Sequence, residues 1–430
     1  MLTVAYLANE FPAPVEPYVG EEIQELRRRG VHVIASSVRR PRSSETSLLL
    51  SESESLCLEP IRTLILLRAF GLMLRRWKRV ASLVTRVLLQ GKELPKLRAK
   101  AILHTCLGAY YAIQLQEHRV DHIHVHHGYF GAWIAMVAAR LSGISFSLTL
   151  HGSDLLLNGA YLDTKLKHCR FCVTISEYNR RYILRNFPGV DPAKILVSRL
   201  GVEVPANPNF LRPQTAARAR DAFTLLAVGR LHAVKDHAFL IRACARLRDC
   251  GLNFECAIAG EGQERQHLEL LIQQYRLHDH LRLLGHVARQ QMDALYLRAD
   301  AVVLTSRSEG IPLVLMEAMA RGKVVVVPAI TGIPELVISG KTGFLYVPGG
   351  LKDFVARILL LEKWTRQEDR NAVSRLDWIR HAARVQVLHN FSRGKNLTRF
   401  ADRFLQSVAS QKFLSKDWKA SHEDLVLQQI

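Results

Sequence analysis

The chain has 430 residues and a formal net charge of +20, from 59 Lys and Arg against 39 Asp and Glu. Hydrophobic residues make up 48% of it and charged residues 23%, which argues against a disordered chain, and its length favours two domains. Its seven cysteines are an odd, scattered set, which argues against a disulfide framework and indicates a reducing compartment.

The N-terminus, Met1-Leu-Thr-Val-Ala-Tyr-Leu7, reads as a buried strand and lacks the basic leader and cleavage site of a signal peptide. No apolar run reaches the roughly 18 residues that span a bilayer. We therefore expect a cytoplasmic protein that acts in solution or at the cytosolic face of a membrane.

The first half of the chain alternates between strand-like and helix-like stretches. Short apolar and β-branched runs predict strands, and longer amphipathic or Ala-rich stretches predict helices. The expected strands cover residues 4–8, 31–35, 122–126, 147–150, 172–175 and 194–198, and the expected helices cover 19–29 and 132–141. This alternation indicates a parallel sheet covered by helices on both faces.

One segment of the first half holds half of the net charge. Between Ile61 and Lys100 there are eleven Lys and Arg residues and one acidic residue, Glu93, a balance of +10. Plotted as one helix, the segment has an apolar face of Leu66, Phe70, Met73, Trp77, Val80, Val84 and Val87 and a nearly opposite basic face of Arg68, Arg75, Arg79 and Arg86.

A basic amphipathic insertion at 61–103 fits an anionic membrane surface, so peripheral membrane contact through 61–100 is expected. A surface helix whose apolar stripe packs on its own domain, with its arginines in solvent, would give the same pattern. Nucleic acid is not an expected partner, because no helix-turn-helix, aromatic-basic platform or zinc module accompanies the charge.

A second α/β series follows a Pro- and Asn-rich stretch, 204–213, that reads as a linker. Strands are expected at 223–228, 254–259, 281–284, 301–305 and 324–327, with helices between them, for example at 236–248 and 263–275. We therefore predict an α/β chain of two doubly wound, Rossmann-like domains that face a central cleft. The N-terminal domain would cover 1–205, the C-terminal domain 214–389, and a terminal helical segment 390–430.

The segment 306–322 carries the most informative pattern. The apolar run 301–305 leads into a loop with Glu309 and then into a helix with Glu317. Loops at the carboxyl ends of parallel strands bind ligands, and two carboxylates there can accept hydrogen bonds from sugar hydroxyls. The amides at the helix start, around Leu313, suit a diphosphate. The competing interpretation is that Glu309 caps the loop and Glu317 lies on a solvated helix face.

A pair of cations follows the first strand of the C-terminal domain. This strand ends at Gly229, Arg230 emerges after it, and Lys235 lies at the start of the next helix. Two cations beside a helix N-terminus suit the phosphate of a nucleotide sugar, where negative charge grows as the glycosidic bond breaks. Unrelated Arg and Lys residues are also common at strand ends. Gly260, in Ala-Gly-Glu-Gly after the next strand, is a weak sign of nucleotide binding.

Histidines follow two strands of the N-terminal domain. His151 and Asp154 come just after one expected strand, and His126 ends another. A lone loop histidine is more often structural than catalytic. His122, His124 and His126 share a strand face, which would suit a metal, but no carboxylate or cysteine accompanies them at ligand spacing, so no metal is expected.

The two glutamates, spaced as Glu309-x7-Glu317 and followed by Ala-Met-Ala-Arg-Gly, closely resemble the signature of glycosyltransferase family 4. Members of that family are retaining, sugar-nucleotide-dependent enzymes of the GT-B fold. The resemblance is strong over residues 145–350, and over the remainder it rests on the expected architecture. It implies a terminal helix that crosses back to the N-terminal domain.

Further motifs extend the resemblance. The stretch from Gly229 to Lys235 resembles the family's Gly-Arg-Leu-x-x-x-Lys-Gly motif, with Asp236 in place of the last Gly. His151-Gly-x-Asp154 resembles the family's His-Gly-x-Asp pattern.

The N-terminal loop differs from that of many family members. Residues 9–20 lack the Gly-Gly loop of those members and resemble instead the exopolysaccharide, colanic-acid-type subgroup, with Glu16 in a Phe-Pro-x-x-x-Glu stretch. Glu16 would touch acceptor or donor, or serve as a loop-capping carboxylate.

The resemblance also implies residue roles. Glu317 would hold the ribose hydroxyls, Glu309 the hexose hydroxyls, Arg230 with Lys235 the diphosphate, and His151 the transferred sugar. The other residues on the donor side would be Gly229, Gly260, Gly310, Ile311, Pro312, Leu313 and Val314, and those on the acceptor side His126, Asp154 and Glu16.

The implied activity is transfer of a hexose from a UDP- or GDP-sugar to a glycan or polyprenol-linked acceptor in exopolysaccharide or other surface-polysaccharide biosynthesis. No cofactor is expected, since the sugar nucleotide is the substrate. No carboxylate stands out as a covalent nucleophile, so front-face attack with retention is expected. Two alternatives remain open: a sugar-nucleotide 2-epimerase of the same fold, and a non-catalytic sugar-nucleotide-binding subunit. The base, the sugar, the acceptor and the oligomeric state do not follow from the sequence.

Overall fold

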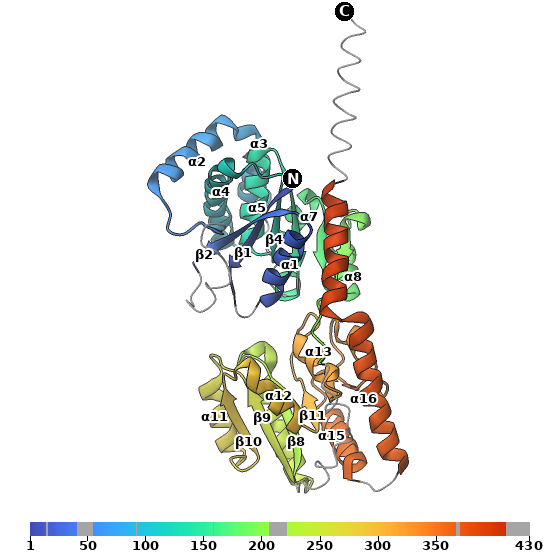
Figure 1. Ribbon diagram of the computed structural model, residues 1–430. Helices are drawn as coiled ribbons and strands as arrows, with labels where there is room; N and C mark the ends of the chain where they lie inside the picture. Colours follow the sequence, from blue (N-terminus) through green and yellow to red (C-terminus); the bar gives the residue numbers. More distant parts are fainter. Residues whose placement is uncertain are drawn as a thin grey trace, which may run out of the picture. The chain divides into compact units, whose positions relative to one another are not determined.

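The computed structural model describes residues 1–13, 16–40, 55–91, 93–157, 159–205, 222–366 and 370–409. The chain divides into two compact units. Unit 1 contains Met1–Ile175, Asn179–Ser198 and the residues from Leu397 onward, and unit 2 contains Ser176–Tyr178 and Arg199–Asn396. Most of the stretch expected as a linker, from residue 206 on, lies outside the described residues. Each unit is built on a parallel sheet with helices against it (Figure 1).

The sheet of unit 1 has seven strands in the order β3-β2-β1-β4-β5-β6-β7, and every neighbouring pair is parallel. The strands are β1 (Thr3–Glu10), β2 (His32–Arg39), β3 (Ser55–Cys57), β4 (His122–His126), β5 (Ser145–Leu150), β6 (Cys172–Thr174) and β7 (Ile195–Val197). Six of them confirm strands expected from the sequence. The seventh, β3, was missed because it is a three-residue edge strand without an apolar run.

The helices of unit 1 connect and cover these strands. They are α1 (Pro17–Arg28), α2 (Thr63–Arg75), α3 (Trp77–Leu88), α4 (Pro95–Leu115), α5 (Phe130–Ser142), α6 (Ser153–Leu156), α7 (Leu162–His168) and α8 (Glu177–Asn186), whose first two residues belong to unit 2. The helices α4 and α5 pack closely at Gly108, where a Cβ atom would lie 2.5 Å from Cβ of Val137. Trp133 on α5 is fully buried in the same core.

The prediction of one amphipathic helix through the basic segment is wrong. The chain breaks at Arg76, between α2 and α3, and the break changes which side chains face the core. Val80 and Val87 on α3 are buried, whereas Phe70 is 58% and Trp77 55% exposed. A helical plot assumes one continuous phase, and a break between two helices resets that phase.

The sheet of unit 2 has six parallel strands in the order β10-β9-β8-β11-β12-β13. Its strands are β8 (Phe223–Val228), β9 (Phe254–Ala259), β10 (Leu281–Gly285), β11 (Ala301–Val303), β12 (Val324–Pro328) and β13 (Phe344–Tyr346). Its helices are α10 (His237–Asp249), α11 (Arg265–Gln274), α12 (Arg289–Arg298), α13 (Leu313–Ala320), α14 (Ile333–Leu336), α15 (Leu351–Arg366) and α16 (Arg370–Asn390). The strand order reverses between β8 and β11, and ligands bind outside the carboxyl ends of strands at such a point.

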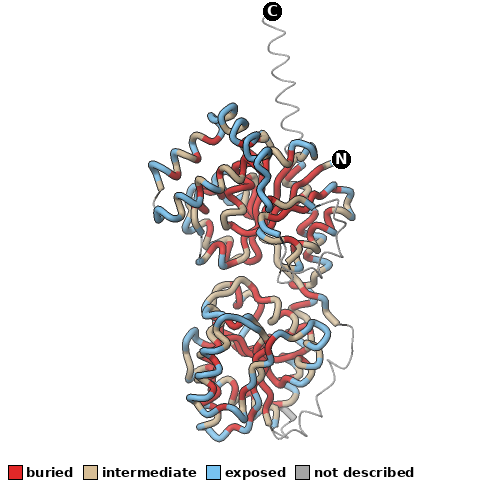
Figure 2. Tube along the Cα trace, turned by 90° about the vertical axis from the view of Figure 1, so that its left-hand side faces the viewer, coloured by how far each residue is buried: buried red, intermediate tan, exposed pale blue. Residues whose placement is uncertain are grey.

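The segment expected as one terminal helix, 390–430, is described as far as residue 409. The helix α16 ends at Asn390, and a further helix covers 393–409. From this last helix Phe400 and Phe404 pack against Val4 and Val19 in a core of unit 1. In each unit the buried residues concentrate on the sheet and on the inner helix faces (Figure 2). Among the described helices, none combines the length and the apolar character needed to cross a bilayer.

Candidate active site

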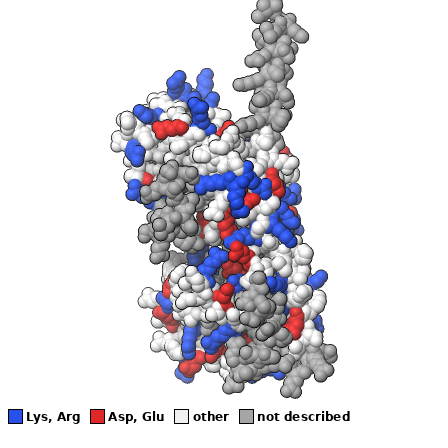
Figure 3. Space-filling model, in the orientation of Figure 1, with Lys and Arg blue, Asp and Glu red and all other residues white. Residues whose placement is uncertain are grey.

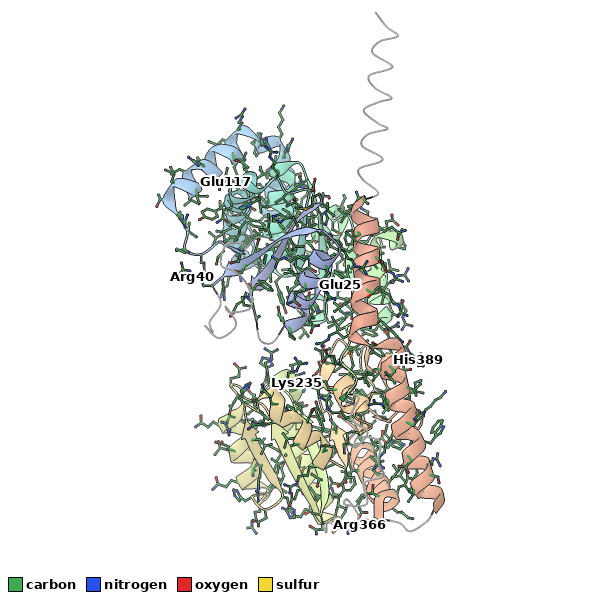
Figure 4. All side chains as sticks on the ribbon, viewed as in Figure 1. Glu25, Arg40, Glu117, Lys235, Arg366 and His389 are labelled. Atoms are coloured by element: carbon green, nitrogen blue, oxygen red, sulfur yellow. The ribbon has the colours of Figure 1, made fainter. Side chains whose placement is uncertain are left out.

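The carboxyl ends of β8 and β11 bring the predicted cations and carboxylates of unit 2 to one edge of the sheet. The two strands are direct neighbours, with Ala227 paired to Val303. Lys235 lies at this edge (Figure 4), and its Nζ is 2.6 Å from Oε1 of Glu309. The Lys235 and Glu309 side chains are only 18% and 12% exposed, so their attraction is less screened than at an open surface. The structure therefore joins two residues that lie 74 positions apart in the sequence.

The loop that carries Lys235 is fastened to the loop that carries Glu309. Thr305 Oγ1 donates to the carbonyl of Lys235 at 3.0 Å, and the Arg307 amide donates to the carbonyl of Val234 at 2.8 Å. Arg230, at the start of the Lys235 loop, is exposed, and its guanidinium makes no hydrogen bond or ion pair with the described residues, although its carbonyl accepts from the His232 amide at 2.9 Å. A cation in this position is available to a ligand.

Glu317 does not lie on a fully solvated helix face. It is half-buried on α13, and Oε2 accepts a hydrogen bond from the Tyr296 hydroxyl at 3.0 Å. Burial, followed by the charge of Glu317, raises the pKa of Tyr296 well above its usual value, so the hydroxyl remains a donor. Tyr296 therefore orients this carboxylate. Sequence reasoning did not identify this contact, because Tyr296 lies on a different helix, α12, from Glu317.

The start of α13 presents backbone amides that have no partner in the described part of the chain. Pro312 is the N-cap residue and supplies no side-chain cap, so the amides of Leu313 and Val314 point out of the helix. They follow Gly310 and Ile311 in the loop. The positive end of a helix dipole and free amides together favour an anion such as a phosphate.

Gly260 has a structural reason to be glycine. Its φ is +154°, and a Cβ atom there would lie 2.0 Å from the carbonyl oxygen of Gly229. The loop after β9 therefore packs backbone to backbone against the loop after β8. This contact supports the Lys235 loop whether or not Gly260 touches a ligand.

The predicted residues of unit 1 also gather, at the carboxyl ends of β4 and β5. Nδ1 of His126 lies 3.0 Å from Nε2 of His151, and Nε2 of His126 lies 3.1 Å from Oε2 of Glu22 on α1. Tyr6 on β1 donates a short hydrogen bond to the same Glu22 oxygen. Glu22 was missed by sequence reasoning. The sign that could have identified it is a carboxylate on the buried face of α1, beside Val19, Ile23 and Leu26.

His127 is a fixed cation between two carboxylates. Its Nε2 lies 2.8 Å from Oε1 of Glu16, and its Nδ1 lies 3.6 Å from Oδ2 of Asp154, a distance at which charges attract but do not hydrogen bond. Burial alone would lower the pKa of His127, but Asp154 and Glu16 outweigh it and raise the pKa to about 10. Glu16, in turn, has a lowered pKa: burial raises it, and the His127 contact more than offsets this.

Asp154 is not a surface residue; it holds the loops after β4 and β5 together from a buried position. It is fully buried and accepts hydrogen bonds from the backbone amides of Gly128 and Gly152, each at 2.8 Å, and from that of His151 at 3.1 Å. Burial raises the pKa of Asp154, but the contact with His127 and these amides holds it well below its usual value. His126 is also buried, at 1% exposure, so both residues lie beneath the surface that an acceptor would touch.

Lys165 supports the same loop from below and was not anticipated. It is 1% exposed, and its Nζ donates to the carbonyls of Gly128 and Ala160 at 2.7 and 2.6 Å. Burial lowers its pKa to about 7. Asp154 and Lys165 thus hold the amide and the carbonyl of Gly128, the residue that follows His127.

The histidines of β4 are paired with hydroxyl groups. Among the described residues, Glu22, His124 and His126 have ligand atoms within 4.8 Å of one another, which is the spacing of a possible metal group. However, the two ring nitrogens of His124 lie 2.7 and 3.0 Å from the hydroxyls of Ser147 and Thr149. These bonds leave His124 no free ligand atom, so the geometry gives the metal interpretation no support.

Comparison with known proteins gives two family matches and several partial relatives. A model described as Glycosyltransferase Family 4 matches residues 15–204, and one described as Glycosyl transferases group 1 matches residues 212–375. The putative colanic acid biosynthesis glycosyltransferase WcaL of Salmonella typhimurium is 35% identical over 176 residues, 40% of this chain and 42% of that protein. The amylovoran biosynthesis glycosyltransferase AmsK of Erwinia amylovora is 33% identical over 178 residues, also 40% and 42%. The matched part is less than half the length of each relative.

Solved structures share the fold. A glycosyltransferase from Rickettsia africae has a TM-score of 0.67 at 18% identity, covering 95% of this chain and 99% of that one. Anabaena HepE in complex with UDP also has a TM-score of 0.67, at 16% identity, covering 94% and 100%. These likenesses confirm the predicted GT-B architecture. With two parallel-sheet α/β units and two family models that together reach from residue 15 to residue 375, the chain belongs to glycosyltransferase family 4.

Proposed function

We propose that the chain is a retaining glycosyltransferase that transfers a hexose from a UDP- or GDP-sugar to a glycan or polyprenol-linked acceptor in surface-polysaccharide biosynthesis. The observation that carries the proposal is the contact of 2.6 Å between Lys235 and Glu309, beside the uncapped start of α13. This arrangement offers a cation, a carboxylate and free amides at the edge of a sheet where strand order reverses. A nucleotide sugar needs these groups: donors for its diphosphate and acceptors for its hydroxyls.

In this proposal the residues of unit 2 hold the donor. Lys235 and Arg230 neutralise the diphosphate as the glycosidic bond to the hexose breaks, and the amides of α13 add donors to the phosphate oxygens. Glu317, oriented by Tyr296, accepts from the ribose hydroxyls, and Glu309 accepts from the hexose. Stabilisation of the leaving nucleotide does most of the catalysis, with no metal or cofactor.

The acceptor would attack on the face from which the nucleotide leaves, and a phosphate oxygen would help to take the proton of its hydroxyl. His151, in the family-like His-Gly-x-Asp pattern, would contact the transferred sugar. The product would keep the anomeric configuration of the donor. An inverted product would exclude this mechanism.

The names of the relatives support the pathway class. WcaL is named for colanic acid biosynthesis and AmsK for amylovoran biosynthesis, both of them polysaccharides. HepE was crystallised with UDP, and a second HepE structure contains UDP and glucose. We therefore place exopolysaccharide assembly first among the surface-polysaccharide pathways.

The first step is to find which sugar nucleotide raises the melting temperature of the purified protein. A ligand that binds the folded state stabilises it by an amount that grows with the logarithm of the ligand concentration over Kd. Each stabilising sugar nucleotide is then incubated with candidate acceptors, and free nucleotide and product anomer are measured. A 2-epimerase would convert the donor without acceptor, and a non-catalytic subunit would bind without turnover. Absence of both a thermal shift and nucleotide release would overturn the proposal.

We also propose that α2 brings the protein to an anionic membrane from the cytosolic side. Leu64, Leu67 and Leu74 form a stripe at helical spacing, and each is more than 60% exposed. Arg68 and Arg75 border that stripe and are exposed as well. The exposed large apolar side chains of the wider segment are Ile61, Leu64, Leu66, Leu67, Phe70, Leu74, Trp77, Leu88, Leu89 and Leu94.

Lys and Arg side chains project from this end of unit 1 (Figure 3). An apolar stripe with flanking cations is the pattern of a helix that lies in a bilayer interface.

Vesicle sedimentation with the full chain tests the membrane proposal. We expect binding to phosphatidylglycerol vesicles and little binding to phosphatidylcholine vesicles. The double substitution Leu67→Ser and Leu74→Ser should weaken it by roughly 10- to 100-fold, from the apolar surface lost. Leu270→Ser, a 59% exposed leucine of unit 2, is the matched control. Equal binding of both variants would refute a role for α2.

A further inference from the structure

Four polar side chains from four elements form a continuous hydrogen-bonded chain inside unit 1. It runs from Tyr6 on β1 through Glu22 on α1 and His126 on β4 to His151 after β5. Tyr6, Glu22 and His126 are buried, with exposures of 1%, 5% and 1%, whereas His151 is half-buried at the end of the chain. This hydrogen-bonded series therefore connects the buried carboxylate of Glu22 to His151, the only one of the four side chains that is partly exposed.

The Glu22 carboxylate determines which atoms of the hydrogen-bonded series carry protons. Nε2 of His126 lies 3.1 Å from the Glu22 carboxylate and 3.2 Å from the Tyr6 hydroxyl, and the Tyr6 proton is donated to Glu22. An ionised carboxylate only accepts hydrogen bonds, so Nε2 of His126 must carry the proton of its bond to Glu22. The neighbouring His127 already holds a positive charge, which disfavours a second one on His126 in the same buried cluster. Nδ1 of a neutral His126 is then an acceptor, and Nε2 of His151, 3.0 Å away, is its donor. This leaves Nδ1 of His151 without a proton.

The ring plane of His151 is fixed by its neighbours. Its centroid lies 4.7 Å from that of Tyr18 and 4.6 Å from that of His127. Its backbone is held as well, because the amide donates to Asp154 and the carbonyl accepts from Asn179. Orientation and tautomer are the two properties that decide whether an imidazole donates to a sugar hydroxyl or accepts from it.

We propose that Glu22 is a positioning residue that sets, through His126, the tautomer and the orientation of His151, so that His151 offers an unprotonated Nδ1. A histidine in this state accepts a hydrogen bond from a hydroxyl of the transferred sugar and does not donate one. The inference rests on the proposed function only in taking His151 as the residue that touches the sugar. The positions of the protons on Tyr6, Glu22, His126 and His151 do not depend on the proposed function.

A purely structural role for Glu22 makes a different prediction. Buried charges are weak contributors to stability, and apolar replacements of similar size are often tolerated. Glu22 faces the same core as Val19, Ile23 and Leu26, where a leucine would be the ordinary choice. If Glu22 serves only packing, Glu22→Leu should change melting temperature alone, without changing the state of the His151 ring.

The first experiment measures the histidine rings directly by nitrogen NMR on the full chain labelled at histidine, with assignment by His151→Gln. We expect His151 as the Nε2–H tautomer in the unmodified protein and a mixed or reversed tautomer in Glu22→Leu. Glu22→Gln, whose carbonyl still accepts from His126, should keep the original tautomer. Either a proton on Nδ1 of His151 in the unmodified chain or an unchanged tautomer in Glu22→Leu overturns the proposal.

The second experiment measures turnover of the sugar nucleotide. Loss of the outer partner of a metal-binding histidine typically costs about 10- to 100-fold in activity, and Glu22 supports His151 in a comparable way. We expect Glu22→Leu to lower kcat by this amount with KM for the donor nearly unchanged, and Glu22→Gln to recover most of it. Glu25→Gln, a buried carboxylate on the same helix that pairs with Arg29, is the matched control.

Unchanged kcat in a folded Glu22→Leu protein would overturn the positioning role. If the unmodified chain turns over no sugar nucleotide, the proposed function fails, and the ring NMR alone still decides the inference about Glu22.

Discussion

Asp236 and Arg307 form an ion pair, with Nε of Arg307 2.7 Å from Oδ2 of Asp236, that ties the loop of Lys235 to the loop of Glu309. Asp236 has φ +47° and ψ +47°, a left-handed conformation that suits glycine, the residue of the family motif at this place. Here the Asp side chain adds two contacts that glycine lacks: the pair with Arg307 and an N-cap bond to the amide of Phe239 at 3.2 Å. Asp236, the residue at which this sequence departs from the motif, therefore links the loop of Lys235 to the loop of Glu309.

Asp236→Gly tests this fastening while the backbone keeps its conformation. Glycine is itself tolerated as an N-cap residue, so the lost cap should cost only about 0.3 kcal/mol, and glycine also tolerates the positive φ. We expect KM for the donor to rise several-fold with little change in melting temperature. Arg307→Ala should have the same effect, and the double variant should be no worse than either single one. Arg298→Ala, which removes an exposed pair with Glu255, is the control. Additive effects would show that the two residues act separately.

Lys235→Ala should abolish most of the transfer activity. The substitution removes the cation proposed for the diphosphate and leaves Glu309 without its partner at 2.6 Å. Loss of one preorganised stabilising group lowers kcat by about 100- to 1,000-fold. Turnover is measured with the donor found by thermal stabilisation, and circular dichroism confirms the fold. Lys352→Ala, an exposed lysine on α15, should leave kcat unchanged. Wild-type turnover in Lys235→Ala would remove Lys235 from the site.

The charge of His127 predicts how stability depends on pH. Burial opposes protonation, but Asp154 and Glu16 raise the pKa of His127 from 6.5 to about 10 in the folded protein. The folded state therefore holds this proton more tightly than the unfolded state. The resulting stabilisation is complete below pH 6.5 and is lost as the pH rises towards 10.

We expect the contribution of His127 to the free energy of unfolding to decrease over this window by on the order of 1 to 3 kcal/mol. Lys165, whose pKa is lowered to about 7, contributes in the opposite direction, so His127 is isolated by comparison with a variant. Urea titrations of the unmodified chain and of His127→Gln between these pH values measure the difference. The glutamine variant should be less stable near neutral pH, and the difference between the two proteins should shrink as the pH rises towards 10. Parallel curves for the two proteins would mean that His127 carries no such charge.

Gly260→Ala should destabilise unit 2. The new Cβ would lie 2.0 Å from the Gly229 carbonyl, so the loops after β8 and β9 would have to separate. Overpacking of this kind costs about 1 to 3 kcal/mol, and the φ of +154° adds strain. Gly189→Ala, where a Cβ meets nothing within 4 Å, is the control. Chemical denaturation measures both. Equal stability would show that the two loops adapt freely.

Much of the fold followed from local patterns. Buried strands of a parallel sheet are continuous apolar runs, so stretches such as 223–228 and 324–327 were recognisable without any knowledge of their neighbours. The motif residues followed as well, because strand ends and helix starts are defined by the order of residues along the chain. The positions of Lys235 and Glu309 at strand ends, and so at one edge of a sheet, could be predicted in this way.

The basic segment shows where local patterns fail. Its apolar residues repeat at helical spacing across Arg76, yet the chain breaks there into α2, which packs on α4, and α3, which packs on α4 and α5. Val80 faces the core and Phe70 faces solvent, although a helical plot puts them on one side. Periodicity records that a helix is amphipathic, but it does not record which neighbour is present to bury the apolar face.

The sequence by itself therefore determined most of the strands, the two α/β units and the candidate residues at strand ends, because each of these depends on residues close together in the chain. Only the tertiary structure decided that Tyr296 orients Glu317, that Asp236 meets Arg307, and that Glu22 reaches His151 through His126. These partners lie on different elements. Which side chains meet is set by strand order and helix packing, and those in turn depend on the burial of apolar surface across the whole unit.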